Sequence, residues 1–249
     1  MVVITTSERN RFDYKEWEAY FRENDAGRLK IDFSQEKALP QKVKKLIFPS
    51  IRAFQKGEGS DGGYLMKTVN AFAVQSGEAD YPDAMRQFVK EENWHSAYLK
   101  TYMEFHGVES AKRSVLDAAF RRLRKLGGLK CEVTILVTAE MIALSYYDAL
   151  SNCTESAALK SICAQMLQDE LPHIVFQSYT LRHFRVRAAD KLARYVLMDV
   201  TSFLVWCAYH RVFRAGGYGF RRFFKENRGY LRQSIQMTER KPQGKVVFS

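Results

Sequence analysis

The sequence contains two pairs of residues in which a glutamate precedes a histidine by three positions. Glu92 and His95 form the first pair, and Glu170 and His173 form the second. Three residues is close to one helical turn, so both side chains of a pair leave the same side of a helix. A carboxylate and an imidazole on a buried face can bind a metal ion. Chance placement of 17 glutamates and 5 histidines would give about 0.3 such pairs, so two pairs favour a metal site over solvated helix faces.

Two long segments with helical periodicity carry these pairs. The first runs from Pro82 to about Phe105 and ends at Gly107, as proline suits a first helical turn and glycine a helix end. The second is expected from Glu155 to Phe184. Pro172 lies between the two candidate ligands of the second segment, removes one backbone hydrogen bond and should kink the helix.

A single glutamate, Glu140, lies in the middle of a third predicted helix, Lys130 to Leu150, which is apolar nearly all round. A helix of this kind is buried, and an unpaired carboxylate inside it is costly unless it is protonated. Metal ligation by Glu140 would remove the cost. A hydrogen bond from Tyr146 or another group is the alternative.

Glycine-rich residues near position 60 offer the fourth ligand. Phe54, Glu58, Asp61, Leu65, Thr68 and Phe72 step by three or four, so one continuous helix would carry them on one face. We prefer Glu58 as the ligand, with Asp61 as second candidate. Four glycines from Gly57 to Gly63 weaken such a helix by about 1 kcal/mol each. The alternative is a loop ahead of a helix that starts near Gly63.

These elements predict an all-α protein with one domain over residues 1–249. Glu-x-x-His pairs on two helices, joined by single glutamates from two others, are typical of ferritin-like four-helix bundles. We expect the core bundle at about 50–184, after an N-terminal cap at 1–49 in which Pro40 and Pro49 bracket a short helix. A basic connector helix at 110–126 and C-terminal helices at about 187–236 complete the prediction.

Composition suggests a cytoplasmic protein. No apolar run reaches the roughly 18 residues of a membrane span, and the N-terminus does not resemble a signal peptide, so we expect no membrane association. The cysteines are scattered and predicted to be reduced thiols: Cys131, Cys153, Cys163 and Cys207.

The formal net charge is +11, and the segment from Cys207 to the end contributes +8, from ten Lys/Arg and two Asp/Glu. A solvated basic surface is the default interpretation. The sharper one is a docking face for an acidic partner, such as an acyl or peptidyl carrier protein. The segment has no recognisable nucleic-acid-binding module, so we do not expect nucleic acid as a partner.

The pairs also carry a family resemblance. The run Glu91-Glu92-Asn93-Trp94-His95 resembles the Glu-Glu-Asn-Arg-His motif of soluble acyl-carrier-protein desaturases, and Asp169 to His173 resembles their Asp-Glu-Lys-Arg-His motif. The glycine-rich runs 57–62 and 214–220 resemble related bacterial ferritin-like diiron proteins. The desaturases differ in having a threonine where this chain has Ala143, and proline within the second pair is unusual. The resemblance implies six metal ligands: Glu58, Glu92, His95, Glu140, Glu170 and His173. It also implies that Glu92 and Glu170 bridge the two metal ions.

The expected function is that of a diiron O2-dependent oxidase, oxygenase or desaturase with an external electron donor. Its substrate would be a small organic molecule or a group tethered to a carrier protein. Four carboxylates and two neutral imidazoles balance two Fe(II) ions, and a Mn/Fe pair is also compatible. Asp169 and Glu91 could orient the histidines through their other ring nitrogens. The alternatives are an iron-handling ferroxidase and a helical binding protein with a structural metal site. The expected partners include a second copy of the chain in a homodimer.

Overall fold

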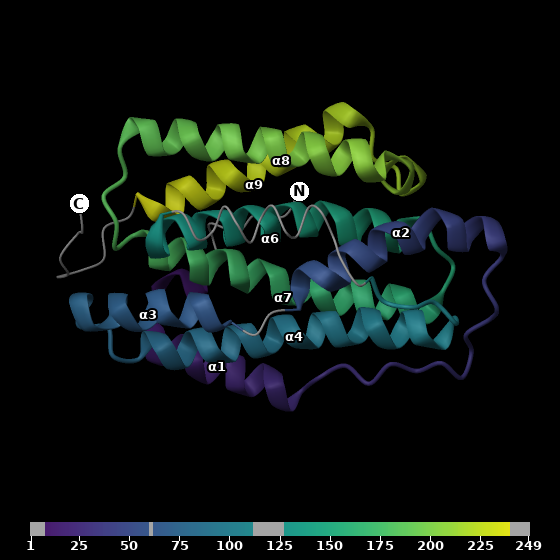
Figure 1. Ribbon diagram of the computed structural model, residues 1–249, viewed down its shortest axis with the longest axis horizontal. Helices are drawn as coiled ribbons and strands as arrows, with labels where there is room; N and C mark the ends of the chain where they lie inside the picture. The colour runs from purple at the N-terminus through teal and green to yellow at the C-terminus, as the bar shows by residue number, and fades with distance from the viewer. Residues whose placement is uncertain (1–7, 60–61, 112–126, 240–249) are drawn as a thin grey trace.

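The computed structural model describes residues 8–59, 62–111 and 127–239 (Figure 1). Within these ranges the chain is helical and has no β-strand, which confirms the predicted all-α class. After a short 3-10 helix, Glu8–Arg11, the α-helices follow in this order: α1 (Tyr14–Ala26), α2 (Gln41–Glu58), α3 (Gly63–Ser76), α4 (Tyr81–Phe105), α6 (Gly128–Asn152), α7 (Ala157–Leu181), α8 (Ala188–Ala215) and α9 (Phe220–Thr238).

The centre of the molecule is formed by α6 and α7, which pack along each other with α4 beside α7 and with α2 and α3 against α4. The apolar sequence of α6 explains its central place, because Val133, Val137 and Met141 are fully buried. The predicted limits of α4, α6 and α7 are correct to within about three residues. In contrast, residues 112–126 of the predicted connector helix lie outside the described residues.

Helix α1 covers the side of the bundle opposite α8 and α9 (Figure 1). It begins with a capping box, in which Asp13 accepts from the backbone of Glu16 and the Glu16 side chain accepts from the backbone of Asp13. Its buried Trp17 and Phe21 rings pack against Phe176 of α7, with centroids 5.5 and 5.3 Å apart. This aromatic contact seals the bundle over α4 and α7.

The prediction that Pro49 ends a short helix is wrong, because α2 continues through Pro49 to Glu58. Apolar packing on both sides of the proline offsets the lost hydrogen bond: Phe48 and Ile51 are buried in the core. The Ser50 hydroxyl donates to the carbonyl of Ile47 at 2.8 Å and accepts from Tyr146 at 3.0 Å. As a result, α2 reaches far enough to bring its last residue into the bundle.

The single continuous helix predicted across the glycines is also wrong. α2 ends at Glu58 and α3 begins at Gly63, as the loop alternative proposed. Gly62 has a φ of 67°, a left-handed conformation that a helix interior excludes and that glycine adopts without strain. Gly59 packs against α4, because a Cβ there would meet the Ser96 hydroxyl at 3.0 Å. Asp61 lies outside the described residues.

Proline is tolerated inside α7 as well. The helix runs without interruption through Pro172 from Ala157 to Leu181, so Glu170 and His173 stay on one face of one helix. Burial of the surrounding turns, including Pro172 itself, compensates the lost backbone hydrogen bond.

Helices α8 and α9 form a layer over α6 and α7 (Figure 1). Gly216, in the turn between them, lies so close to α6 that a Cβ there would overlap the backbone carbonyl of Ala149. By length and composition alone, α6 and α8 could each cross a membrane. In its most apolar window, 78% of α6 is buried inside the molecule, whereas only 33% of α8 is. The high buried share of α6 is that of a core helix. The low share of α8 means that much of this helix is not covered by the rest of the described chain.

Candidate metal centre

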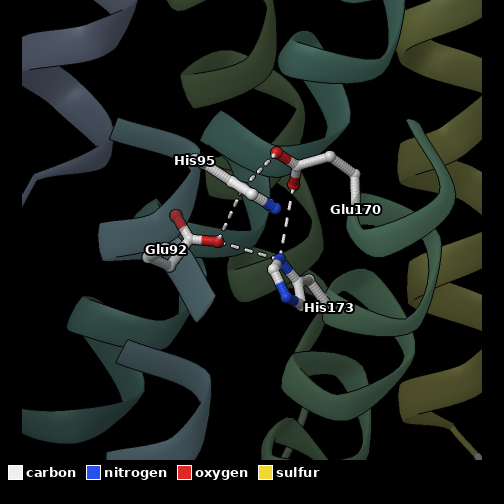
Figure 2. Close-up of side chains that lie close together, drawn as sticks. All are labelled: Glu92, His95, Glu170 and His173. Atoms are coloured by element: carbon white, nitrogen blue, oxygen red, sulfur yellow. Dashed lines mark ion pairs between the residues drawn. The ribbon is translucent and has the colours of Figure 1, made fainter. Parts of the chain in front are cut away.

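Glu92 and His95 on α4 face Glu170 and His173 on α7 (Figure 2). Each residue offers one ligand atom such that all four atoms lie within 4.8 Å of one another. Both histidines and Glu170 are fully buried, and the Glu92 side chain is 13% exposed. The three-residue spacing places each pair on one helix face, and the packing of α4 along α7 brings the two faces together.

Each of the two glutamates lies near both histidines. Glu92 Oε1 is 3.6 Å from His95 Nδ1 and 2.9 Å from His173 Nδ1. Glu170 presents one oxygen to each ring, at 3.6 Å in both cases. Two ligands that each sit about 2.0–2.2 Å from one ion are about 3–4 Å apart, so these separations suit shared coordination.

The outer ring nitrogens are bound by acids from the opposite helix. His95 Nε2 lies 3.0 Å from Asp169 of α7, and His173 Nε2 lies 2.9 Å from Glu91 of α4. An ionised carboxylate only accepts hydrogen bonds, so each Nε2 carries the proton. When a bound cation keeps the rings neutral, the inner Nδ1 atoms are unprotonated and present lone pairs to the centre. The contacts expected of Asp169 and Glu91 with the outer ring nitrogens are therefore present.

Two amides hold these acids in turn. Gln165 donates to both oxygens of Asp169, at 2.9 and 3.0 Å, and Asn24 of α1 donates to Glu91 at 3.0 Å. A small surface pocket lies outside them, between α1, α4 and α7, and both acids line it. The acids therefore separate this pocket from the histidine rings.

Glu58 and Glu140 complete the acidic set from two other helices. The Tyr147 hydroxyl of α6 donates to Glu58, whose carboxyl group also faces Glu92. Glu140 lies beside Glu170, 4.0 Å from His173 Nδ1. The Gln177 amide donates to its other oxygen at 3.2 Å. All six predicted ligands thus lie in one cluster, which α2, α4, α6 and α7 form.

Crowding of these acids changes their protonation. Burial, with the charge of Glu92, raises the pKa of Glu58 to about 8. Burial also raises the pKa of Glu170 to about 7 and that of Glu140 well above its usual range, where Glu170 adds repulsion. For His173, contacts with Glu170, Glu91 and Glu92 outweigh burial and raise the pKa well above the usual value. The cluster therefore holds protons at neutral pH, as expected where negative charges gather without cations.

Several buried ligand atoms of the cluster make no hydrogen bond of good geometry among the described residues, although His173 Nδ1 and Glu92 Oε1 lie 2.9 Å apart. They are Glu92 Oε1, His95 Nδ1, both Glu170 oxygens and His173 Nδ1. A buried group without a partner costs about 1–3 kcal/mol, so five in one place need a common explanation. Divalent cations between them would provide it. The residues present therefore fit a metal centre of oxygen and imidazole ligands.

The hydrogen-bond partners of the buried acids, and the remaining buried histidines, were only partly predicted from the sequence. Tyr146 donates to Ser50 and not to Glu140, but Gln177 supplies the hydrogen bond from another group that the alternative allowed. Tyr147 and Gln177, which do contact the acids, lacked a sequence signal beyond their place on buried helices. His106 ends α4 near Glu36, and His183 contacts Glu78 at 3.0 Å. Both histidines lie outside the cluster.

No protein-family model, curated protein or solved structure matches the chain.

Proposed function

We propose that this chain is an oxidoreductase of the ferritin-like dimetal-carboxylate kind, which uses O2 to oxidise, oxygenate or desaturate an organic substrate. Glu58, Glu92, His95, Glu140, Glu170 and His173 would hold two metal ions, with Glu92 and Glu170 shared between them. The similarity of the two Glu-x-x-His runs to those of the acyl-carrier-protein desaturases supports the same assignment.

The observation that carries the proposal is the orientation of the two histidines. Each turns an unpartnered Nδ1 toward the same two glutamates while its Nε2 donates to an acid on the opposite helix. A histidine that serves only packing or a surface ion pair has no need of this arrangement. A metal ligand does, because a hydrogen bond at the outer nitrogen fixes the tautomer and raises the basicity of the inner one.

The ligand types favour iron or manganese. Four carboxylates and two imidazoles, without thiolate, suit these metals better than they suit copper or a zinc–thiolate site, and four negative charges balance two divalent ions. Two reduced iron ions would supply the electrons and the open coordination positions that O2 activation requires.

The surrounding residues would orient the ligands and exclude water. Phe88 of α4 and Phe21 of α1 pack against the His173 ring, with centroids 4.7 and 5.9 Å away. The Tyr147 hydroxyl and the Gln177 amide hold Glu58 and Glu140 in place. An apolar wall of this kind keeps a reactive centre dry and strengthens electrostatic interactions inside it.

The substrate would be a small molecule or a group tethered to a carrier protein. The second case is supported by the exposed side of α9, where Arg221, Lys225 and Arg232 lie on one face. A basic face of this kind attracts an acidic carrier. Electrons would come from an external donor.

Anaerobic loading with Fe(II), followed by metal analysis and O2 uptake, tests the proposal. We expect two iron ions per chain and O2 consumption in the wild type. Glu140→Gln should lose at least one ion. Glu132→Gln, a buried acid of the same helix that accepts from Thr68 at 2.9 Å, is the matched control and should keep both. Continuous oxidation of excess Fe(II) would indicate a ferroxidase instead. Failure to bind iron would refute the centre, and binding without O2 uptake would leave a structural metal site.

A further inference from the structure

The outward side of α8 is apolar over more than four turns. Its exposed positions between residues 192 and 208 include no charged side chain. Five large side chains on it are exposed to between 45% and 66%: Leu192, Val196, Val200, Phe203 and Leu204. Three smaller exposed residues lie between and beside them: Ala193, Cys207 and Ala208. We call these eight residues the α8 stripe.

The α8 stripe is large enough to form the centre of an interface. A large aromatic side chain presents on the order of 150–250 Å², and Leu and Val present less, so five that are about half exposed present roughly 400 Å². This is within the range of the largest apolar patch of a typical monomer, which is often functional. A standard interface covers roughly 800 Å² per partner, so the stripe would supply about half of it and a polar rim the rest.

The lack of charged side chains on the α8 stripe allows a second copy of this strongly basic chain as the occupant. The net charge of +11 makes contact between copies unfavourable wherever lysines and arginines meet. The α8 stripe avoids this problem because it carries no charge. Beside its middle, Arg228 of α9 is neutralised by Asp199 through two contacts of 2.7 and 2.6 Å. A symmetric contact centred there brings no unpaired charges together at its centre.

Side-chain sizes along the stripe suit an antiparallel arrangement about Val200. In that register Leu192 lies opposite Ala208, and Val196 lies opposite Leu204. Each pair joins a larger side chain to a smaller one, and the twofold axis repeats both pairs on the other side of Val200. Antiparallel helices also oppose their dipoles favourably. We propose that two copies of this chain form a twofold dimer through their α8 stripes, with Val200 next to the symmetry axis.

The dimer would leave the pocket beside the metal centre uncovered. α8 lies on one side of the bundle and α1 on the other (Figure 1). The pocket that reaches Glu91 and Asp169 is lined by α1, α4 and α7. A partner that approaches this pocket would therefore meet no obstacle from the second copy.

The first experiment measures the molar mass of the full chain by analytical ultracentrifugation over a range of concentrations. We expect a dimer for the wild type and at least a 100-fold weaker association for Val200→Glu. Val74→Glu is the matched control, because Val74 of α3 is 86% exposed and outside the stripe, and it should remain dimeric. Circular dichroism checks that both variants fold. A monomeric wild type at all concentrations, or equal dissociation of both variants, overturns the proposal.

Cross-linking tests the register. In a Cys207→Ser background, Val200→Cys should form a disulfide-linked dimer on mild oxidation, whereas Val74→Cys should not. Leu192→Cys alone should stay uncross-linked but should link to Ala208→Cys in a mixed sample. A wild-type monomer that floats with phosphatidylcholine vesicles, and loses this property in Val200→Glu, would assign the stripe to a lipid surface instead. None of these measurements requires metal, so they are independent of the proposed function.

Discussion

His95 on α4 and Asp169 on α7 are joined across the bundle by a hydrogen bond of 3.0 Å, although 74 residues separate them in the chain. The reverse connection, from His173 on α7 to Glu91 on α4, spans 82 residues. Each helix therefore supplies the acid that orients the other helix's histidine. Metal affinity should depend on these acids even though they are not proposed as ligands.

Asp169→Asn tests this dependence. The amide keeps the size of the side chain but removes the charge that holds the Nε2 proton of His95, so metal affinity should fall about 10–100-fold. Competition titration with a metal chelator measures the change. Glu155→Gln, which removes an exposed acid near the start of α7, provides the control and should leave affinity unaltered. Equal affinity in wild type and Asp169→Asn would mean that His95 is not a ligand.

Replacing Glu170 should have opposite effects on the metal-free and metal-loaded proteins. Both of its oxygens are buried without a hydrogen-bond partner among the described residues. In the metal-free protein, Glu170→Leu should therefore increase the free energy of unfolding by about 1–3 kcal/mol. For a chain of this size, each kcal/mol raises Tm by about 2–4 °C. Thermal unfolding in EDTA should show the increase, and added Fe(II) should stabilise the wild type but not the variant. A lower Tm in EDTA would contradict this account of the cluster.

Proton release should accompany metal binding. The pKa values of Glu58 and Glu170 are raised to about 8 and about 7, so both hold protons at pH 6 that a bound cation must displace. Affinity should rise with pH up to about 8, by as much as tenfold per pH unit for each proton released. In the metal-free protein, folding raises both pKa values. Their contribution to stability is therefore present at low pH and is lost as pH rises through about 7 and 8. Metal titrations at pH 6, 7 and 8 and weakly buffered proton-release measurements check both trends.

Two glycine substitutions test the break between α2 and α3. Gly62 has a left-handed backbone, so Gly62→Ala should lower the free energy of unfolding by about 1–2 kcal/mol. Gly57 lies inside α2 with open space around its Cα, so Gly57→Ala should raise it by about 0.5–1 kcal/mol. Urea denaturation measures both. One continuous helix would make both substitutions stabilising, which is the result that would exclude the break.

The sequence was sufficient to predict what depends on local spacing. Glu92 and His95 share a helix face because they are three residues apart, and the apolar run around Glu140 predicts a buried helix on periodicity alone. The break before Gly63 was harder to predict, because the same residues satisfy a helical step pattern and a glycine turn. Tertiary packing decides between them, as it does for the helix that continues through Pro49.

Contacts between distant segments could not be predicted in detail. That Glu91 binds His173, and not the histidine four residues after it, follows from how α4 lies along α7. The donors to Glu58 and Glu140 are Tyr147 and Gln177, and nothing in their local sequence distinguishes them from neighbouring buried polar residues. Such choices depend on the register between helices, which a single sequence does not specify.

The closeness of Gly216 to Ala149 ties the last two helices to the part of the molecule that carries the candidate metal centre. Any larger side chain at that position would wedge the turn outward and uncover the back of α6, the helix that carries Glu140. Helices α8 and α9 are therefore part of the same packed core as α6 and α7. A protein that ended before residue 188 would lack α8 and α9 and would expose the core residues that these helices cover.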